Sequence, residues 1–156
     1  MPEIILTSGV GEGLTELSAF DAALHDAGIK NLNLIPLSSV IPTGSKITER
    51  KYELDPKHFG YRAYVVISSE KTSKKGETVA AGLGWVINET NGGLFVEHHG
   101  YSPERVKEQI KDSLTHMVTY RKEKYGPIQS KTADIKCKDK PVCALVAAIY
   151  KVEGWN

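Results

Sequence analysis

Short apolar runs separated by polar turns dominate the pattern along the chain, and they predict more strands than helices. Residues 3–8 form the first run, and residues 31–37 form another that ends at two adjacent serines. The turn signal Asn91-Gly92-Gly93 separates two later runs, which we expect to pair as a hairpin. Including that pair, the remaining expected strands are 61–69, 77–88, 94–99, 128–136 and 142–152.

Two stretches carry the start and stop signals of a helix. The first begins after Thr15, whose hydroxyl can cap it, and runs to about Ala27, where Gly28 ends it. The second begins at residues 102–103, a capping serine followed by a proline, and runs to about residue 122. Apolar residues at every fourth position give this second helix one stripe for burial: Val106, Ile110, Leu114 and Val118.

The order of these elements predicts the fold class. About seven strands and two long helices fit one α/β (α+β) domain that spans residues 1–156. Because few helices alternate with strands, we expect a layered sandwich with mainly antiparallel or mixed sheets rather than a doubly wound fold. Gly9, Gly11 and Gly13 predict a flexible turn before the first helix, and residues 42–60 predict a solvated loop.

Composition and charge narrow the range of partners. Charged residues make up 25% of the chain, but the formal net charge is only +1, which gives no reason to expect nucleic acid or an anionic membrane. No apolar run approaches the ~20 residues of a membrane span, and the first residues lack the features of a signal peptide. We therefore expect a cytoplasmic protein. Cys137 and Cys143 match no zinc or redox spacing and are expected to be buried, reduced thiols.

The pair Ser38-Ser39 is the first candidate for chemistry. Two adjacent serines are ordinary at a strand end or turn. In the functional interpretation, the Ser39 hydroxyl attacks the carbonyl carbon of Ser38 and converts the amide to an ester. Elimination then leaves dehydroalanine at position 39, and loss of ammonia with addition of water yields a pyruvoyl group. Such a ketone can form a Schiff base with a substrate amine.

Two carboxylates occupy positions where burial is expected. Asp21 falls within the apolar stripe of the first helix, four residues after Leu17 and three before Leu24. A carboxylate there either pairs with an internal donor or binds a cationic ligand. Glu97 shares a strand face with Phe95, where partial desolvation would raise its pKa toward that of a general acid. An exposed edge-strand glutamate is the alternative interpretation of Glu97.

Three further patterns have ordinary explanations. His98 and His99 point to opposite faces of their strand, so we expect hydrogen-bonded histidines rather than two ligands of one metal. The segment 9–13 is similar to a phosphate loop, but Glu12 inside it would repel phosphate and the dinucleotide spacing is incomplete. The basic run 71–75 is expected to be a solvated turn between strands.

Several segments together resemble the family of pyruvoyl-dependent arginine decarboxylases, and the resemblance covers most of the chain. Its specific part is the serine pair preceded by Asn33, within the run 31–42. The supporting segments, in the same order along the chain, are 14–24, 27–29, 76–78 and 94–100. The resemblance implies a four-layer αββα sandwich that cleaves itself between Ser38 and Ser39 into a β chain (1–38) and an α chain (39–156). It further implies a homotrimer with active sites between neighbouring protomers.

The resemblance also assigns roles to the candidate residues. Ser39 matches the pyruvoyl precursor, Asn33 an asparagine that assists processing, and Glu97 the proton donor. Substrate-binding roles fall to Asp21, Leu24 and Ser38, with Asp21 pairing with the guanidinium of arginine. Lys30 lies between the helix of Asp21 and the strand of Asn33, where it either competes for Asp21 or points to solvent.

The implied reaction converts L-arginine to agmatine and carbon dioxide through a Schiff base on the pyruvoyl group, with no pyridoxal phosphate and no metal. Arginine decarboxylation serves polyamine synthesis or acid resistance. Three alternatives stay open. One is a pyruvoyl decarboxylase of histidine or aspartate, although Asp21 would repel aspartate. The second is an uncleaved arginine- or polyamine-binding module of the same fold. The third is a small nucleotide-binding domain that uses residues 9–13.

Overall fold

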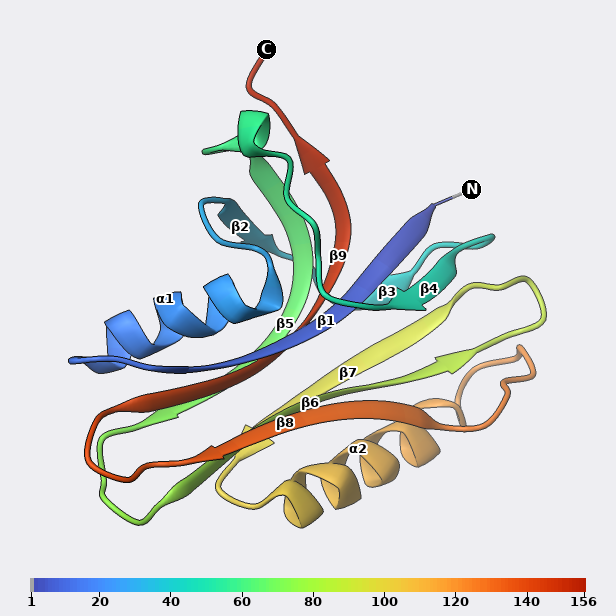
Figure 1. Ribbon diagram of the computed structural model, residues 1–156. Helices are drawn as coiled ribbons and strands as arrows, with labels where there is room; N and C mark the ends of the chain where they lie inside the picture. The colour runs from blue at the N-terminus through green and yellow to red at the C-terminus, as the bar shows by residue number, and fades with distance from the viewer. Residues whose placement is uncertain (1) are drawn as a thin grey trace.

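The computed structural model describes residues 2–156, which fold into two β-sheets and two α-helices (Figure 1). The five-stranded sheet has the order β2-β5-β9-β1-β4, and the four-stranded sheet has the order β3-β7-β6-β8. The first sheet comprises β1 (Glu3–Glu12), β2 (Asn33–Pro36), β4 (Lys46–Glu49), β5 (Arg62–Thr72) and β9 (Val142–Glu153). The second comprises β3 (Val40–Ile41), β6 (Thr78–Ile87), β7 (Gly93–Gly100) and β8 (Gln129–Lys136).

The pairing of the strands confirms the expected sheet type. In the five-stranded sheet β9 pairs antiparallel with both β1 and β5, whereas the edge strands β2 and β4 pair parallel with β5 and β1. The four-stranded sheet is antiparallel throughout. The predicted hairpin exists as β6 and β7, and the Asn88 side-chain oxygen organises its turn by accepting from the backbone N–H groups of Thr90 and Gly92.

Helix α1 (Glu16–Ala27) forms where the capping signals predicted it. Thr15 accepts from the backbone N–H of Ser18, and the Ser18 hydroxyl accepts from the backbone N–H of Thr15, which completes a capping box. Gly28 ends the helix with a φ of +88°. The buried face of α1 consists of three alanines, Ala19, Ala23 and Ala27, and it packs on the five-stranded sheet.

The glycines before α1 do not form the predicted turn, because Gly9 and Gly11 lie within strand β1. A Cβ at Gly9 would come within 2.8 Å of the Ala27 backbone nitrogen, and one at Gly11 within 2.5 Å of the Ala19 carbonyl oxygen. Helix α1 therefore lies directly on the backbone of β1, and only glycine leaves room for it. Since α1 covers these residues, the segment is not a phosphate-binding loop.

Helix α2 (Pro103–Met117) packs on the four-stranded sheet through the predicted residues Val106, Ile110 and Leu114. It ends at Met117, five residues before the expected end. The last carbonyl groups find other donors: the Thr119 hydroxyl donates to His116 O, and the Arg121 guanidinium donates to Met117 O. These contacts give the carbonyl groups of His116 and Met117 hydrogen-bond donors, so the helix can end there.

The two sheets pack against each other around an apolar core that both of them supply. Leu6, Val66 and Val146 come from the five-stranded sheet, and Leu83 and Phe95 come from the four-stranded sheet. Helices α1 and α2 lie on the outer sides of their respective sheets (Figure 1).

The predicted loop 42–60 contains regular structure. Residues 46–49 form β4, which extends the five-stranded sheet by pairing parallel with β1, and residues 56–58 form a 3₁₀ turn. The parallel edge strand β4 depends on pairing with a distant segment, which a local hydrophobic pattern does not report.

The basic run 71–75, predicted as a solvated turn, begins inside β5, where Thr72 is buried.

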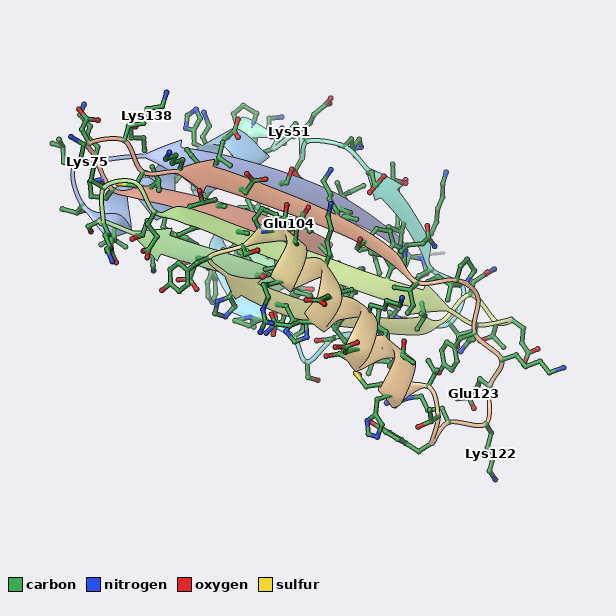
Figure 2. All side chains as sticks on the ribbon, turned by 90° about the horizontal axis from the view of Figure 1, so that it is seen from below. Lys51, Lys75, Glu104, Lys122, Glu123 and Lys138 are labelled. Carbon is green, nitrogen blue, oxygen red and sulfur yellow. The ribbon has the colours of Figure 1, made fainter. Side chains whose placement is uncertain are left out.

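The two cysteines are buried and free, as expected, and burial raises the pKa of the Cys143 thiol to about 11. Charged side chains of both signs extend outward, among them Lys75 and Lys138 near one end of the molecule and Lys122 and Glu123 near the other (Figure 2). Within residues 2–156, neither helix has the length and apolar character needed to cross a membrane.

The close approach of α1 to β1 gives a stability prediction. Gly11→Ala places a methyl group against helix backbone that cannot rotate away, so we expect the free energy of unfolding to fall by about 3 kcal/mol or more. Urea unfolding measures this loss. Gly100→Ala is the matched control, because Gly100 is also a strand glycine but a methyl group there would have no other atom within 4 Å. A Gly11→Ala protein as stable as the control would contradict the packing.

Candidate functional site

The serine pair lies where the chain passes from one sheet to the other. On one side, the backbone N–H of Leu37 donates to Val65 O of β5 at 2.8 Å, which extends the β2–β5 pairing. On the other side, the backbone N–H of Phe95 in β7 donates to Ser39 O, also at 2.8 Å. Ser38 stands between these anchors and is exposed, whereas Ser39 is half-buried. The Ser38-Ser39 bond is thus held from both sheets.

Ser39 has a strained backbone. Its φ is +95°, a region that residues with a Cβ rarely adopt. The anchors on both sides account for this conformation, because the chain must turn between two fixed points within very few residues. Strain of this kind persists only where the surrounding structure enforces it, and it concentrates at functional sites.

Tyr150 of β9 holds the residue after the serine pair. Its hydroxyl donates to Val40 O at 2.9 Å, and its ring packs against Phe95 with the ring centres 6.3 Å apart. Burial raises the pKa of Tyr150, so the hydroxyl remains a hydrogen-bond donor at neutral pH. The carbonyl groups of residues 39 and 40 are therefore each fixed by a donor, one from each sheet.

Glu97 lies on β7, two residues beyond Phe95, or about 7 Å along the strand. Its side chain is exposed to solvent. Neighbouring protein atoms nevertheless desolvate the carboxyl group and raise its pKa, and His99 on the same strand face opposes that shift. The direction of the shift matches the expectation for a proton donor, and β7 brings Glu97 to the same region as the serine pair.

The two histidines after Glu97 behave as expected. His98 Nε2 lies 2.7 Å from the Ser113 hydroxyl of α2, whereas His99 Nδ1 lies 2.8 Å from a carboxylate oxygen of Glu70 in β5. They face opposite sides of the strand and have separate hydrogen-bond partners. Among the residues that the structure describes, no group of three or more His, Cys, Asp or Glu side chains is arranged to hold a metal ion.

Asn33 lies away from the serine pair within this chain. Its side-chain amide donates to Gly60 O at 2.9 Å, at the end of β2 opposite to the serines. Residues 33–37 are extended, so about 13 Å separates the Cα atoms of Asn33 and Leu37. The Asn33 amide therefore does not reach the Ser38 carbonyl of its own chain.

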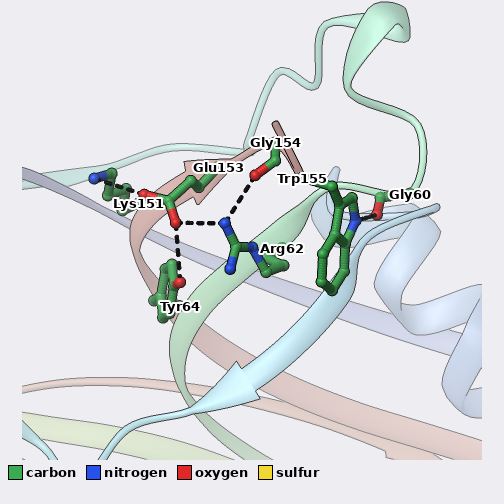
Figure 3. A network of polar contacts seen from close by, with 7 residues as sticks. All are labelled: Gly60, Arg62, Tyr64, Lys151, Glu153, Gly154 and Trp155. Carbon is green, nitrogen blue, oxygen red and sulfur yellow. Dashed lines mark hydrogen bonds and ion pairs between the residues drawn. The ribbon is translucent and has the colours of Figure 1, made fainter.

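A polar network holds the carbonyl group to which Asn33 donates (Figure 3). The Trp155 indole N–H also donates to Gly60 O, at 2.8 Å, and the Arg62 guanidinium lies over the Trp155 ring. Arg62 in turn donates to Gly154 O at 2.8 Å and to the Glu153 carboxylate at 2.7 Å. The network fixes the start of β5, and with it the position of Asn33.

Asp21 does not lie in a buried stripe, which corrects the sequence prediction. The buried face of α1 is the alanine row, and Asp21 is exposed beside Leu17, a residue that is 75% exposed. Leu24 is half-buried against the α1 core. The spacing of residues in α1 is compatible with more than one buried face. The face with the smallest side chains is the buried one, because α1 packs directly on the glycines of β1. Lys30 is exposed, and within residues 2–156 it forms no ion pair with Asp21.

Comparison with known proteins identifies the family of this chain. The family model of pyruvoyl-dependent arginine decarboxylase matches residues 3–153. Among similar proteins, the pyruvoyl-dependent arginine decarboxylases of Pyrococcus furiosus and Thermococcus sibiricus are 35% and 36% identical to this chain, each over 93% of it and 92% of the relative. That of Thermococcus kodakarensis is 33% identical over 91% of the chain and 90% of the relative.

The chain therefore belongs to the family of pyruvoyl-dependent decarboxylases, and within it to the pyruvoyl-dependent arginine decarboxylases. The resemblance drawn from the serine pair and its flanking segments is confirmed, and so is the prediction that the chain is an enzyme of this family.

Sequence reasoning missed two groups at the serine pair: the Tyr150 hydroxyl and the backbone N–H of Phe95. Tyr150 ends an apolar run in β9, about 110 residues from Val40, so no local pattern links the two. A backbone donor carries no sequence signal at all.

The conformation of Ser39 gives a second prediction. Ser39→Gly and Ser39→Ala both remove the hydroxyl, but glycine accepts a φ of +95° without strain. We expect the glycine variant to be more stable in urea unfolding by about 1 kcal/mol. Ser38, which is not among the described residues with positive φ, supplies the control pair, and there alanine should be the more stable substitution. The same order at both positions would contradict strain at Ser39.

Proposed function

We propose that this protein decarboxylates L-arginine to agmatine and carbon dioxide, using a pyruvoyl group that it makes at position 39 by cleaving its own chain. The observation that carries the proposal is the strained Ser39, in a segment that Leu37 and Ser39 anchor to different sheets, within a chain whose family model matches residues 3–153. Strain at this residue raises the energy of the intact chain relative to the cleaved one.

Self-cleavage would follow the route expected for a Ser-Ser bond. The Ser39 oxygen attacks the carbonyl carbon of Ser38, the C–N bond breaks, and an ester joins the two residues. Loss of a proton from the α-carbon of residue 39 expels the Ser38 carboxylate and leaves dehydroalanine. Water then adds to its imine tautomer and ammonia departs. The result is a β chain of residues 1–38 and an α chain of residues 39–156.

The surroundings of residue 39 fit a pyruvoyl group. Such a group supplies a ketone that forms a Schiff base with the α-amine of an amino acid and accepts the electrons that decarboxylation releases. The carbonyl of residue 39 already accepts a hydrogen bond from the Phe95 N–H, and a backbone donor placed there stabilises negative charge that develops on that oxygen. No side chain needs to move to provide this contact.

Glu97 is the proposed proton donor. It lies on the strand that anchors residue 39, and desolvation raises its pKa, so it holds a proton at a higher pH than an ordinary glutamate. A protonated carboxyl group close to the reacting carbon can replace the departed carboxylate with a proton.

The positions of Asn33 and Asp21 support an active site between protomers. Within one chain Asn33 faces Gly60, and Asp21 is exposed on the outer side of the five-stranded sheet, so neither lies beside Ser39. A second copy could bring them there. This favours a homotrimer of cleaved protomers, each an αββα sandwich of four layers formed by α1, the two sheets and α2.

Arginine is the proposed substrate because the exposed Asp21 carboxylate, with Leu17 and Leu24 on the same helix, suits a guanidinium carried on an apolar stem. Asp21 would repel aspartate. Histidine offers a smaller cation and a shorter stem, so its decarboxylation is the second candidate.

The intact mass of the purified, denatured protein tests the proposal first. We expect two chains split after Ser38, with the larger one carrying a ketone in place of the amine of Ser39. The same preparation should release carbon dioxide from L-arginine and not from L-aspartate. Ser39→Ala is the control and should stay as one chain without activity. A wild-type chain that stays intact and has no activity would contradict the proposed decarboxylase and favour an uncleaved arginine- or polyamine-binding module.

The raised pKa of Glu97 predicts a pH dependence. The protonated carboxyl group is the active form, so kcat should be constant below its pKa and fall as the pH rises through it. Glu97→Gln should lower kcat by roughly 100-fold or more and remove this decline. Glu89→Gln, at an exposed position in the β6–β7 turn, should keep the wild-type profile. An unchanged profile in Glu97→Gln would exclude Glu97 as the donor.

A further inference from the structure

We propose that Tyr150 is a positioning residue for the pyruvoyl group: its hydroxyl holds the Val40 carbonyl and so keeps residue 39 in place after the chain has been cleaved. This inference rests on the proposed function. Tyr150 acts through the backbone of the neighbouring residue and does not touch the substrate.

The need for such a contact follows from what cleavage removes. In the intact chain, residue 39 is tied to the five-stranded sheet through Ser38 and Leu37, whose N–H donates to Val65 O. Breaking the Ser38-Ser39 bond cuts this connection and turns residue 39 into a chain terminus. Chain termini fray unless other contacts hold them.

The remaining contacts of the new terminus are few. Strand β3 contains only Val40 and Ile41, and it pairs with β7 at the edge of the four-stranded sheet. Val40 is 62% exposed and contributes little burial, although Ile41 is buried. The Phe95 N–H holds the carbonyl of residue 39 from β7. After cleavage, the bond from the Tyr150 hydroxyl to Val40 O still ties the new terminus to the five-stranded sheet.

The surroundings of Tyr150 suit it to this role. It lies on β9, the central strand of the five-stranded sheet, and packs against the core between the sheets. Its ring contacts Phe95, the same residue whose N–H binds the carbonyl of residue 39. Two consecutive carbonyl groups are thus fixed by donors from two residues whose rings pack together, which limits rotation of the peptide unit next to the ketone.

Tyr150→Phe tests the inference because it removes the hydroxyl and keeps the ring. The measurements are kcat per pyruvoyl group, with the groups counted by phenylhydrazine titration, and KM for L-arginine. We expect kcat per pyruvoyl group to fall roughly tenfold, the loss that corresponds to one hydrogen bond, with KM changed less than twofold. Self-cleavage should still proceed, since the intact chain keeps its covalent tie.

Tyr125→Phe is the control: the Tyr125 hydroxyl contacts Glu123 after α2, away from the serine pair, and its loss should leave kcat per pyruvoyl group unchanged. A purely structural effect of Tyr150→Phe would reduce the number of pyruvoyl groups but not the turnover of each. That result, or full activity, overturns the role of Tyr150 while the proposed function stands. A wild-type protein that forms no pyruvoyl group overturns both.

Discussion

The candidate site depends on one constraint: residues 37 and 39 are bonded to different sheets, so the chain between them cannot relax. The Leu37 N–H is fixed to β5 and the Ser39 carbonyl to β7, and the core between the sheets keeps these strands at a set separation. A positive φ at Ser39 follows from this geometry. Without the apolar contacts of Phe95, Leu83 and their partners, the serine pair would be an ordinary flexible connection.

Close packing also governs the outer faces of the sheets. Helix α1 lies on Gly9 and Gly11 of β1, and a Cβ at Gly84 of β6 would run into Ile110 of α2. Each helix thus packs over glycine residues of its sheet, which lets the helix lie close to the sheet backbone. Because the packed sheets hold residues 37 and 39 at fixed positions, the Ser38-Ser39 bond between these anchors is constrained as well.

The sequence identified candidate residues better than it predicted their surroundings. It identified Ser38, Ser39 and Glu97 as candidates, and the structure places the serine pair directly before β3, which pairs with β7, the strand of Glu97. It also predicted both helices and most strands. It was wrong about the burial of Asp21 and about the secondary structure of the β1 glycines and of residues 46–49. These properties depend on which distant segment packs against or pairs with each residue.

The sequence by itself therefore determined both helices, most of the strands, the sheet type and the family, since each rests on local periodicity, capping residues or a short motif. The tertiary structure alone decided that Ser39 is strained, that Tyr150 and the Phe95 N–H hold the residues beside it, and that Asn33 points away from it. These features arise from contacts between residues far apart in the chain, which form only when the two sheets close on their common core.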